Sequence, residues 1–173
     1  NNFDSSHNIR INEYSKLLKQ RNKILKENEG DNDWLKAIED QLSKLAVAVC
    51  SSRLDIVSRL TKFLEKKSKG FPNLSLNFVD SIENNLLLKP AIEIENELKE
   101  NYYKSRKIDV LIGGSIYGCH KTELACFNLE KNMSADMCSS GEQKLLLISI
   151  MLACAKTLKE SIKISPIMLL DEI

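Results

Sequence analysis

The chain has 173 residues, of which 43% are hydrophobic and 28% are charged, and its formal net charge is +1 at pH 7. This length is enough for one domain with a hydrophobic core, or for parts of two domains. The small net charge gives no overall field of the kind that indicates nucleic-acid binding, although it leaves room for a local basic patch. We find neither a signal peptide nor an apolar stretch that could span a bilayer, so we expect no contact with a membrane.

The number and spacing of the cysteines indicate a protein of the reducing cytoplasm. There are five of them, scattered and without a C-x-x-C pair: Cys50, Cys119, Cys126, Cys138 and Cys154. An odd, scattered count of this kind indicates buried thiols rather than a disulfide framework. His120 lies near Cys119 and Cys126, but no second pair completes a zinc site, so we predict no metal there. The sequence begins at Asn1 rather than Met and stops at Ile173, so we expect it to be part of a longer protein.

The first 70 residues predict two helices. Apolar residues recur at helical spacing from Ile9 to about Asn28, and a turn over 28–33 separates them from a longer helix over 34–67. The second helix carries a heptad seam, formed by Leu35, Ile38, Leu42, Leu45 and Val49. Two helices joined by a short turn are expected to fold back as an antiparallel hairpin. The small apolar stretch 45–50 is expected to pack against another element. The lysines near residues 62–69 are interpreted as a solvated helix end in preference to a DNA contact.

Residues 74–129 are predicted to contain strands, a helix and loops. Leu74, Leu76 and Phe78 alternate with polar residues, which predicts a half-buried strand. A helix is expected from Leu86 to about Lys104, with Pro90 limiting its start. Ranges 111–115 and 118–121 are typical of loops, and range 124–129 of a strand.

The stretch Cys138-Ser-Ser-Gly-Glu-Gln-Lys144 predicts a helix start suited to phosphate. Ser139 and Ser140 are good N-cap residues, and Glu142 and Gln143 each follow one of them at capping-box spacing. Gly141 lets a partner approach the backbone. A helix that begins here presents N–H groups and the positive end of its dipole, which suit a phosphate.

The residues that follow predict a buried helix and then a buried strand. Range 145–152 is apolar on all sides of a helix, which favours burial. Pro166 can begin a strand, and Ile167–Leu170 is a continuous apolar run typical of a covered parallel strand. Asp171 and Glu172 follow at its carboxyl end, where open α/β sheets place their chemistry. An aspartate there can hold Mg²⁺, and a glutamate can orient or deprotonate a water.

Either motif alone has an ordinary structural interpretation. Ser-Ser-Gly-Glu is a common helix start, and four apolar residues before Asp-Glu are also common. The two motifs together, in this order and about one helix apart, are far more specific.

With these motifs the chain resembles the RecF family of bacterial recombination and gap-repair ATPases, which belong to the SMC-like ABC ATPases. The resemblance covers the whole chain but only the C-terminal part of such a protein. It rests on the residue ranges 14–22, 45–49, 118–124, 139–144 and 167–172. The third range departs from the family pattern G-P-H-R-x-D-L, because Cys119 replaces a proline, Lys121 an arginine and Glu123 an aspartate. Gly114 also stands where the family has an arginine.

The resemblance implies an α/β fold: a partial ABC-type ATPase head, with a signature helix and a Walker B strand, and an inserted antiparallel helical hairpin arm. Residues 1–70 would form the arm and residues 71–173 the C-terminal part of the head. No G-x-x-x-x-G-K-[ST] phosphate loop occurs in the chain, so we expect no ATP hydrolysis by the chain alone.

The resemblance also implies roles for individual residues. The signature would cap the γ-phosphate of ATP held by a second head, through residues Ser139, Ser140, Gly141, Glu142, Gln143 and Lys144. Asp171 would hold Mg²⁺ through water, and Glu172 would be the general base. His120 and Lys121 belong to a family motif whose role we leave open.

The implied protein is cytoplasmic and forms an ATP-dependent homodimer on gapped DNA, at junctions of single strand and duplex. It would act in DNA replication, recombinational repair and the SOS response, with RecO and RecR as partners. The alternative is a non-enzymatic remnant of a disrupted gene that acts only as a helical interaction fragment. A coiled-coil adaptor is a third interpretation, which explains the first 70 residues but not residues 138–173.

Overall fold

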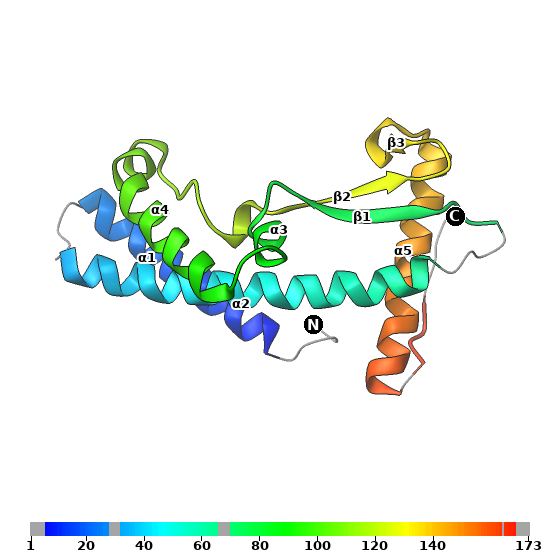
Figure 1. Cartoon of the computed structure of the whole chain (residues 1–173), viewed down its shortest axis with the longest axis horizontal. Helices are drawn as coiled ribbons and strands as arrows, with labels where there is room; N and C mark the ends of the chain where they lie inside the picture. Colours follow the sequence, from blue (N-terminus) through cyan, green and yellow to red (C-terminus); the bar gives the residue numbers. More distant parts are fainter. Residues whose placement is uncertain (1–5, 28–31, 66–69, 164, 169–173) are drawn as a thin grey trace. The chain divides into compact units, whose positions relative to one another are not determined.

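A computed structural model describes residues 6–27, 32–65, 70–163 and 165–168 of the chain (Figure 1). Its elements, in chain order, are α1 (His7–Glu27), α2 (Asn32–Leu64), β1 (Leu74–Val79), α3 (Ile82–Leu86), α4 (Ala91–Ile112), the 3₁₀ turn η1 (Cys119–Lys121), β2 (Glu123–Asn128), β3 (Met133–Ser134), the 3₁₀ turn η2 (Ala135–Met137) and α5 (Ser140–Ile162).

Packing groups the described residues into two compact units. Unit 1 contains the described residues of the ranges 6–53 and 80–123, and unit 2 contains those of the ranges 54–79 and 124–168. Helix α2 therefore contributes its first part to unit 1 and its last turns to unit 2. This grouping does not follow a boundary at residue 70, and the division into an arm (1–70) and a head (71–173) stays a prediction.

In unit 1, helices α1 and α2 form the antiparallel hairpin that the sequence predicted. Arg10, early in α1, donates from Nη1 to Ser52 Oγ at 2.8 Å. Arg21, late in α1, donates from Nε to Glu39 Oε1, early in α2, at 3.0 Å. The earlier residue of α1 contacts the later residue of α2, and the later residue of α1 contacts the earlier one, so the two helices run antiparallel.

The small apolar stretch of α2 packs against α4, as expected. Ala46, Val49 and Cys50 are fully buried, and they share a hydrophobic core with Ile94 and Leu98 of α4. Short side chains here let the backbones of the helices approach closely and fill the space between them.

Arg21 lies in a lysine-rich part of α1 but does not face solvent. Its side chain is fully buried and is held by Glu39, by Asp109 at 2.7 Å and by the carbonyl of Tyr102 at 2.7 Å. Arg106 adds a second cation to Glu39, so the buried charges balance. Pairing of this kind is what makes burial of a guanidinium tolerable.

The predicted helix over 86–104 is wrong at both ends. Leu86 is the last residue of α3, and α4 begins only at Ala91, after Pro90 as N-cap residue. Proline favours such a helix start because it needs no N–H partner there. Helix α4 then extends to Ile112, through residues expected in a loop, and ends on Gly113 with a φ of 75°.

Unit 2 contains a three-stranded sheet with the order β1-β2-β3. Strands β2 and β3 are antiparallel, with Phe127 opposite Ser134. Leu74 and Leu76 of β1 are buried while Asn77 is exposed, so the predicted half-buried strand is confirmed. Strand β2 likewise coincides closely with the strand predicted over 124–129.

Helix α5 is not buried on all sides, contrary to the prediction from its apolar sequence. Leu146 and Ala153 are buried in a core that includes Leu60 of α2 and the inner face of β1. On other sides of the helix Leu147 is 57% exposed and Met151 37%. In the described ranges only one side of the helix is covered, by α2 and the sheet.

The predicted strand 167–170 is not seen where it can be checked. Ile167 and Met168 have irregular backbone, and Ile167 is 90% exposed. Residues 169–173, which include Asp171 and Glu172, lie outside the described residues, as do the turn 28–31 and lysines 66, 67 and 69. Within the described ranges no helix has the length and apolarity needed to cross a membrane.

Candidate nucleotide-capping site

The amino end of α5 is held by a capping box between Ser139 and Glu142, as the sequence predicted. The Ser139 N–H donates to Glu142 Oε2 at 3.0 Å, and the Ser139 hydroxyl donates to the same oxygen at 2.8 Å. The carboxylate thus fixes the residue before the first helical turn.

The surface of this helix tip is open. Ser140, Gly141 and Lys144 are exposed, and a Cβ added to Gly141 would meet nothing within 4 Å. Nothing in the described part of the chain therefore demands a glycine at this position. The first N–H groups of a helix have no acceptor within the helix, and the dipole adds positive potential. The tip can accept an anion that approaches from outside.

Gln143 braces the turn in front of the helix. Its Nε2 donates to the carbonyl of Asp136 at 3.2 Å and to that of Cys138 at 3.1 Å. In this arrangement both N–H groups of the Gln143 amide hydrogen-bond to the backbone before α5 and hold it in place.

The turn between β2 and β3 is organised by Asn128, which is 2% exposed. Its Oδ1 accepts from the N–H of Glu130 at 3.0 Å and from that of Lys131 at 3.3 Å. Its Nδ2 lies 3.9 Å from Cys138 Sγ, which in turn lies 3.6 Å from the carbonyl of Ser134. The turn and the entry to α5 are thereby tied together.

Lys131 projects from this turn and pairs with Glu142 Oε1. Together with the two donors of Ser139, it lowers the pKa of Glu142 to about 2, with the Lys131 hydrogen bond as the largest cause. Glu142 is therefore ionised throughout the physiological range. The same interaction raises the pKa of Lys131.

Residues 118–123 of the family motif belong to unit 1, whereas Leu124 and the α5 tip belong to unit 2. His120 Nε2 donates to the Ser115 carbonyl at 3.1 Å, so its Nδ1 accepts from the Tyr14 hydroxyl at 2.8 Å. Partial burial lowers the pKa of His120 and favours this neutral form. Tyr14 also contacts the hydroxyl of Tyr102, at 3.1 Å. The imidazole is thus held in place by its neighbours in unit 1.

Gly118 is required by this arrangement. Its φ is 125°, and a Cβ there would lie 2.0 Å from the Tyr14 hydroxyl oxygen. Beside it, the Arg53 guanidinium donates to the Cys119 carbonyl at 2.6 Å and to buried Glu83 at 3.2 Å. Hydrogen bonds and close packing hold the motif, even though Cys119 replaces the family's proline.

Lys121 is exposed beside a cavity of about 340 Å³. The cavity is lined by polar and apolar groups of unit 1, among them Asp80 and Glu97.

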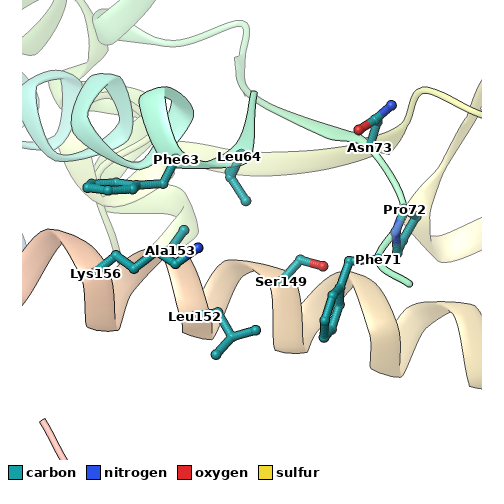
Figure 2. Close-up of a pocket in the computed structure, with 9 residues that line it drawn as sticks. All are labelled: Phe63, Leu64, Phe71, Pro72, Asn73, Ser149, Leu152, Ala153 and Lys156. Atoms are coloured by element: carbon teal, nitrogen blue, oxygen red, sulfur yellow. The ribbon is translucent and has the colours of Figure 1, made fainter. Parts of the chain in front are cut away.

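A second cavity lies in unit 2 between the last turn of α2, the segment before β1 and the buried side of α5 (Figure 2). Phe63, Phe71 and Ser149 are among its lining residues, and its volume is about 40 Å³. Small-molecule sites usually span about 300–1,000 Å³. This cavity has room for water but not for a nucleotide.

The structure brings Ser139, Ser140, Gly141, Glu142, Gln143 and Lys144 together at this tip. Asp171 and Glu172 lie outside the described residues, so their predicted roles stay predictions. The sequence pattern did not reveal Lys131, whose only signal was a lysine in a turn before the signature. A charge in a turn has no periodicity from which a contact could be predicted.

No protein-family profile matches the chain. Curated proteins do: the "DNA replication and repair protein RecF" of Rickettsia prowazekii (strain Madrid E) is 36% identical over 172 residues, which are 99% of this chain and 48% of that protein. The protein of the same name from Brucella abortus (strain 2308) is 32% identical over 173 residues, 99% of this chain and 45% of its own length.

Solved structures share the fold. "Structure of the recombination mediator protein RecF-ATP in RecFOR pathway" matches 98% of this chain and 46% of that chain, with a TM-score of 0.80 and 21% identity. "Structure of the recombination mediator protein RecF-ATPrS in RecFOR pathway" matches 95% of this chain and 45% of that chain, with a TM-score of 0.78 and 19% identity. The chain spans about half the length of the relatives it matches.

The helix-rich architecture with a small antiparallel sheet matches that of about half of the solved RecF structure. Nearly the whole length of the chain is homologous to RecF proteins. The chain corresponds to the C-terminal part of such a protein.

Proposed function

We propose that this chain supplies the signature side of the ATP site of a RecF-like DNA replication and repair protein. Ser140 and Gly141 would cap the terminal phosphate of a nucleotide held by the phosphate loop of a second head. Gln143 would join them by exchanging its hydrogen bonds to the carbonyls of Asp136 and Cys138 for bonds to the phosphate. Lys144 would add positive charge. The observation that carries this proposal is the exposed amino end of α5, where a preformed capping box faces open space at Gly141.

The family resemblance extends the proposal to residues outside the described ranges. Asp171 would hold Mg²⁺ through water, since carboxylate oxygens suit that ion. Glu172 would orient or deprotonate the attacking water. If another polypeptide supplies the phosphate loop, two complete heads would dimerise around ATP.

At the level of the cell, the dimer would bind gapped DNA at junctions of single strand and duplex, in the cytoplasm. It would act in recombinational repair and the SOS response together with RecO and RecR. These partners and pathways come from the family resemblance and from the relatives' names.

Nucleotide binding tests the proposal. We would titrate a fluorescent ATP analogue with Mg²⁺ against this chain alone and against a mixture with a polypeptide that carries the phosphate loop of a RecF relative. The proposal requires binding that is tighter in the mixture than with either polypeptide alone. Ser140→Arg should abolish that gain, because its side chain would occupy the open surface of the tip.

A matched control is Ser161→Arg, near the other end of α5, which should keep the gain in binding. Equal binding with and without this chain would instead favour the helical interaction fragment without a nucleotide role. ATP hydrolysis by the pure chain would contradict the expectation that it is inactive alone.

A further inference from the structure

A lysine outside the signature is built into the tip of α5. Lys131 lies in the turn between β2 and β3, and its backbone N–H is held by the side chain of buried Asn128 at 3.3 Å. The same asparagine contacts Cys138, the residue directly before the capping serine. The turn that presents Lys131 is thus fixed relative to the helix start within unit 2.

The Lys131 ammonium pairs with one oxygen of Glu142, and Ser139 uses the other. Glu142 therefore has both carboxylate oxygens engaged. Without the lysine, an uncompensated carboxylate would stand in the first turn of the helix that is to receive a phosphate, where it would repel the ligand. The Glu142 carboxylate stabilises the helix start but would repel an anion bound there. The ion pair with Lys131 offsets that repulsion and keeps the cap in place.

We propose that Lys131 is a positioning residue for the nucleotide-capping tip: it holds Glu142 in the capping box and neutralises its charge toward an incoming triphosphate. This inference rests on the proposed function. Lys131 acts through Glu142 and the helix start, so a cation that keeps this contact should be able to replace it.

The first test is nucleotide binding by the mixture described above. Lys131→Met should weaken MgATP-analogue binding on the order of tenfold, because it exposes one negative charge to the phosphates. Lys131→Arg should bind within about twofold of wild type, since a guanidinium pairs readily with a carboxylate. Lys159→Met removes an exposed charge near the far end of α5 and serves as the matched control.

Unchanged binding by Lys131→Met would overturn the inference, and so would equal losses in Lys131→Met and Lys131→Arg. The salt dependence adds a readout that a purely structural role would not move. The Lys131→Met defect should shrink at high salt, which screens exposed charges.

The second test uses the chain alone and separates the two proposals. The Glu142 carboxyl, followed by NMR, should titrate near pH 2 in wild type and closer to its usual range in Lys131→Met. If the mixture binds no nucleotide while this shift is seen, the proposed function fails and the tie between Lys131 and Glu142 stands. If the Glu142 pKa is the same in both proteins, the positioning role itself is wrong.

Discussion

Arg21 and Asp109 form an ion pair of 2.7 Å with both side chains fully buried, although they lie on different helices, α1 and α4. The Asp109 carboxylate also accepts from the Ser105 hydroxyl at 2.7 Å and from the N–H of Ile116 at 3.0 Å. It therefore connects the hairpin, the end of α4 and the loop that leads to the His120 motif.

Arg21→Met should destabilise the chain by about 3–5 kcal/mol, because it leaves the buried Asp109 carboxylate without its cation. Urea unfolding followed by circular dichroism measures this loss. Lys16→Met, an exposed change on the same helix, should stay within about 0.5 kcal/mol of wild type. A loss below about 1 kcal/mol for Arg21→Met would show that the pair is not formed as described.

Gly118→Ala should cost at least about 2 kcal/mol, because alanine is strained at a φ of 125° and its Cβ would overlap the Tyr14 hydroxyl. Gly114→Ala is the control, since a Cβ there meets nothing within 4 Å. In the Tyr14→Phe background the same Gly118→Ala change should cost less, because one overlapping atom is gone. Equal costs in both backgrounds would contradict the close approach of Tyr14 and Gly118.

The lowered pKa of His120 predicts a loss of stability in acid. Its folded pKa lies below the unfolded value of about 6.5, so the stability contribution is present above pH 6.5 and is lost as pH falls through the folded pKa. Unfolding free energies of wild type and His120→Gln, compared between pH 7.5 and 5.5, should show a smaller decline in the variant. An NMR titration that gives a His120 pKa at or above 6.5 would refute the prediction.

The elements with a regular pattern were predictable from sequence, and the contacts between them were less so. Two helical patterns joined by a short turn predicted the hairpin, and alternation at Leu74 and Leu76 predicted a half-buried strand. The spacing of Ser139 and Glu142 predicted the start of α5. Each of these depends on neighbours within a turn or a strand, which the order of residues records directly.

Polar contacts between residues far apart in the chain have no local sequence pattern from which they could be predicted. Arg21 lies among lysines in the sequence, a pattern typical of a solvated helix face, yet its partners Glu39 and Asp109 come from two other helices. Lys131 meets Glu142 only because Asn128 shapes the intervening turn. The apolar sequence of α5 led to the wrong prediction that the helix is buried on all sides. Hydrophobicity indicates that a helix surface can be covered, but it does not indicate which residues cover it.

The two sides of α5 should respond differently to substitution in the isolated chain. Leu146 is 2% exposed in the core of unit 2, so Leu146→Ala should cost about 2–5 kcal/mol of unfolding free energy. Leu147 is its sequence neighbour with the same side chain but is 57% exposed, so Leu147→Ala should change stability by no more than about 0.5 kcal/mol. Denaturant unfolding of both variants makes the comparison. Similar losses would mean that the side of α5 carrying Leu147 is covered in solution, as the sequence pattern first suggested.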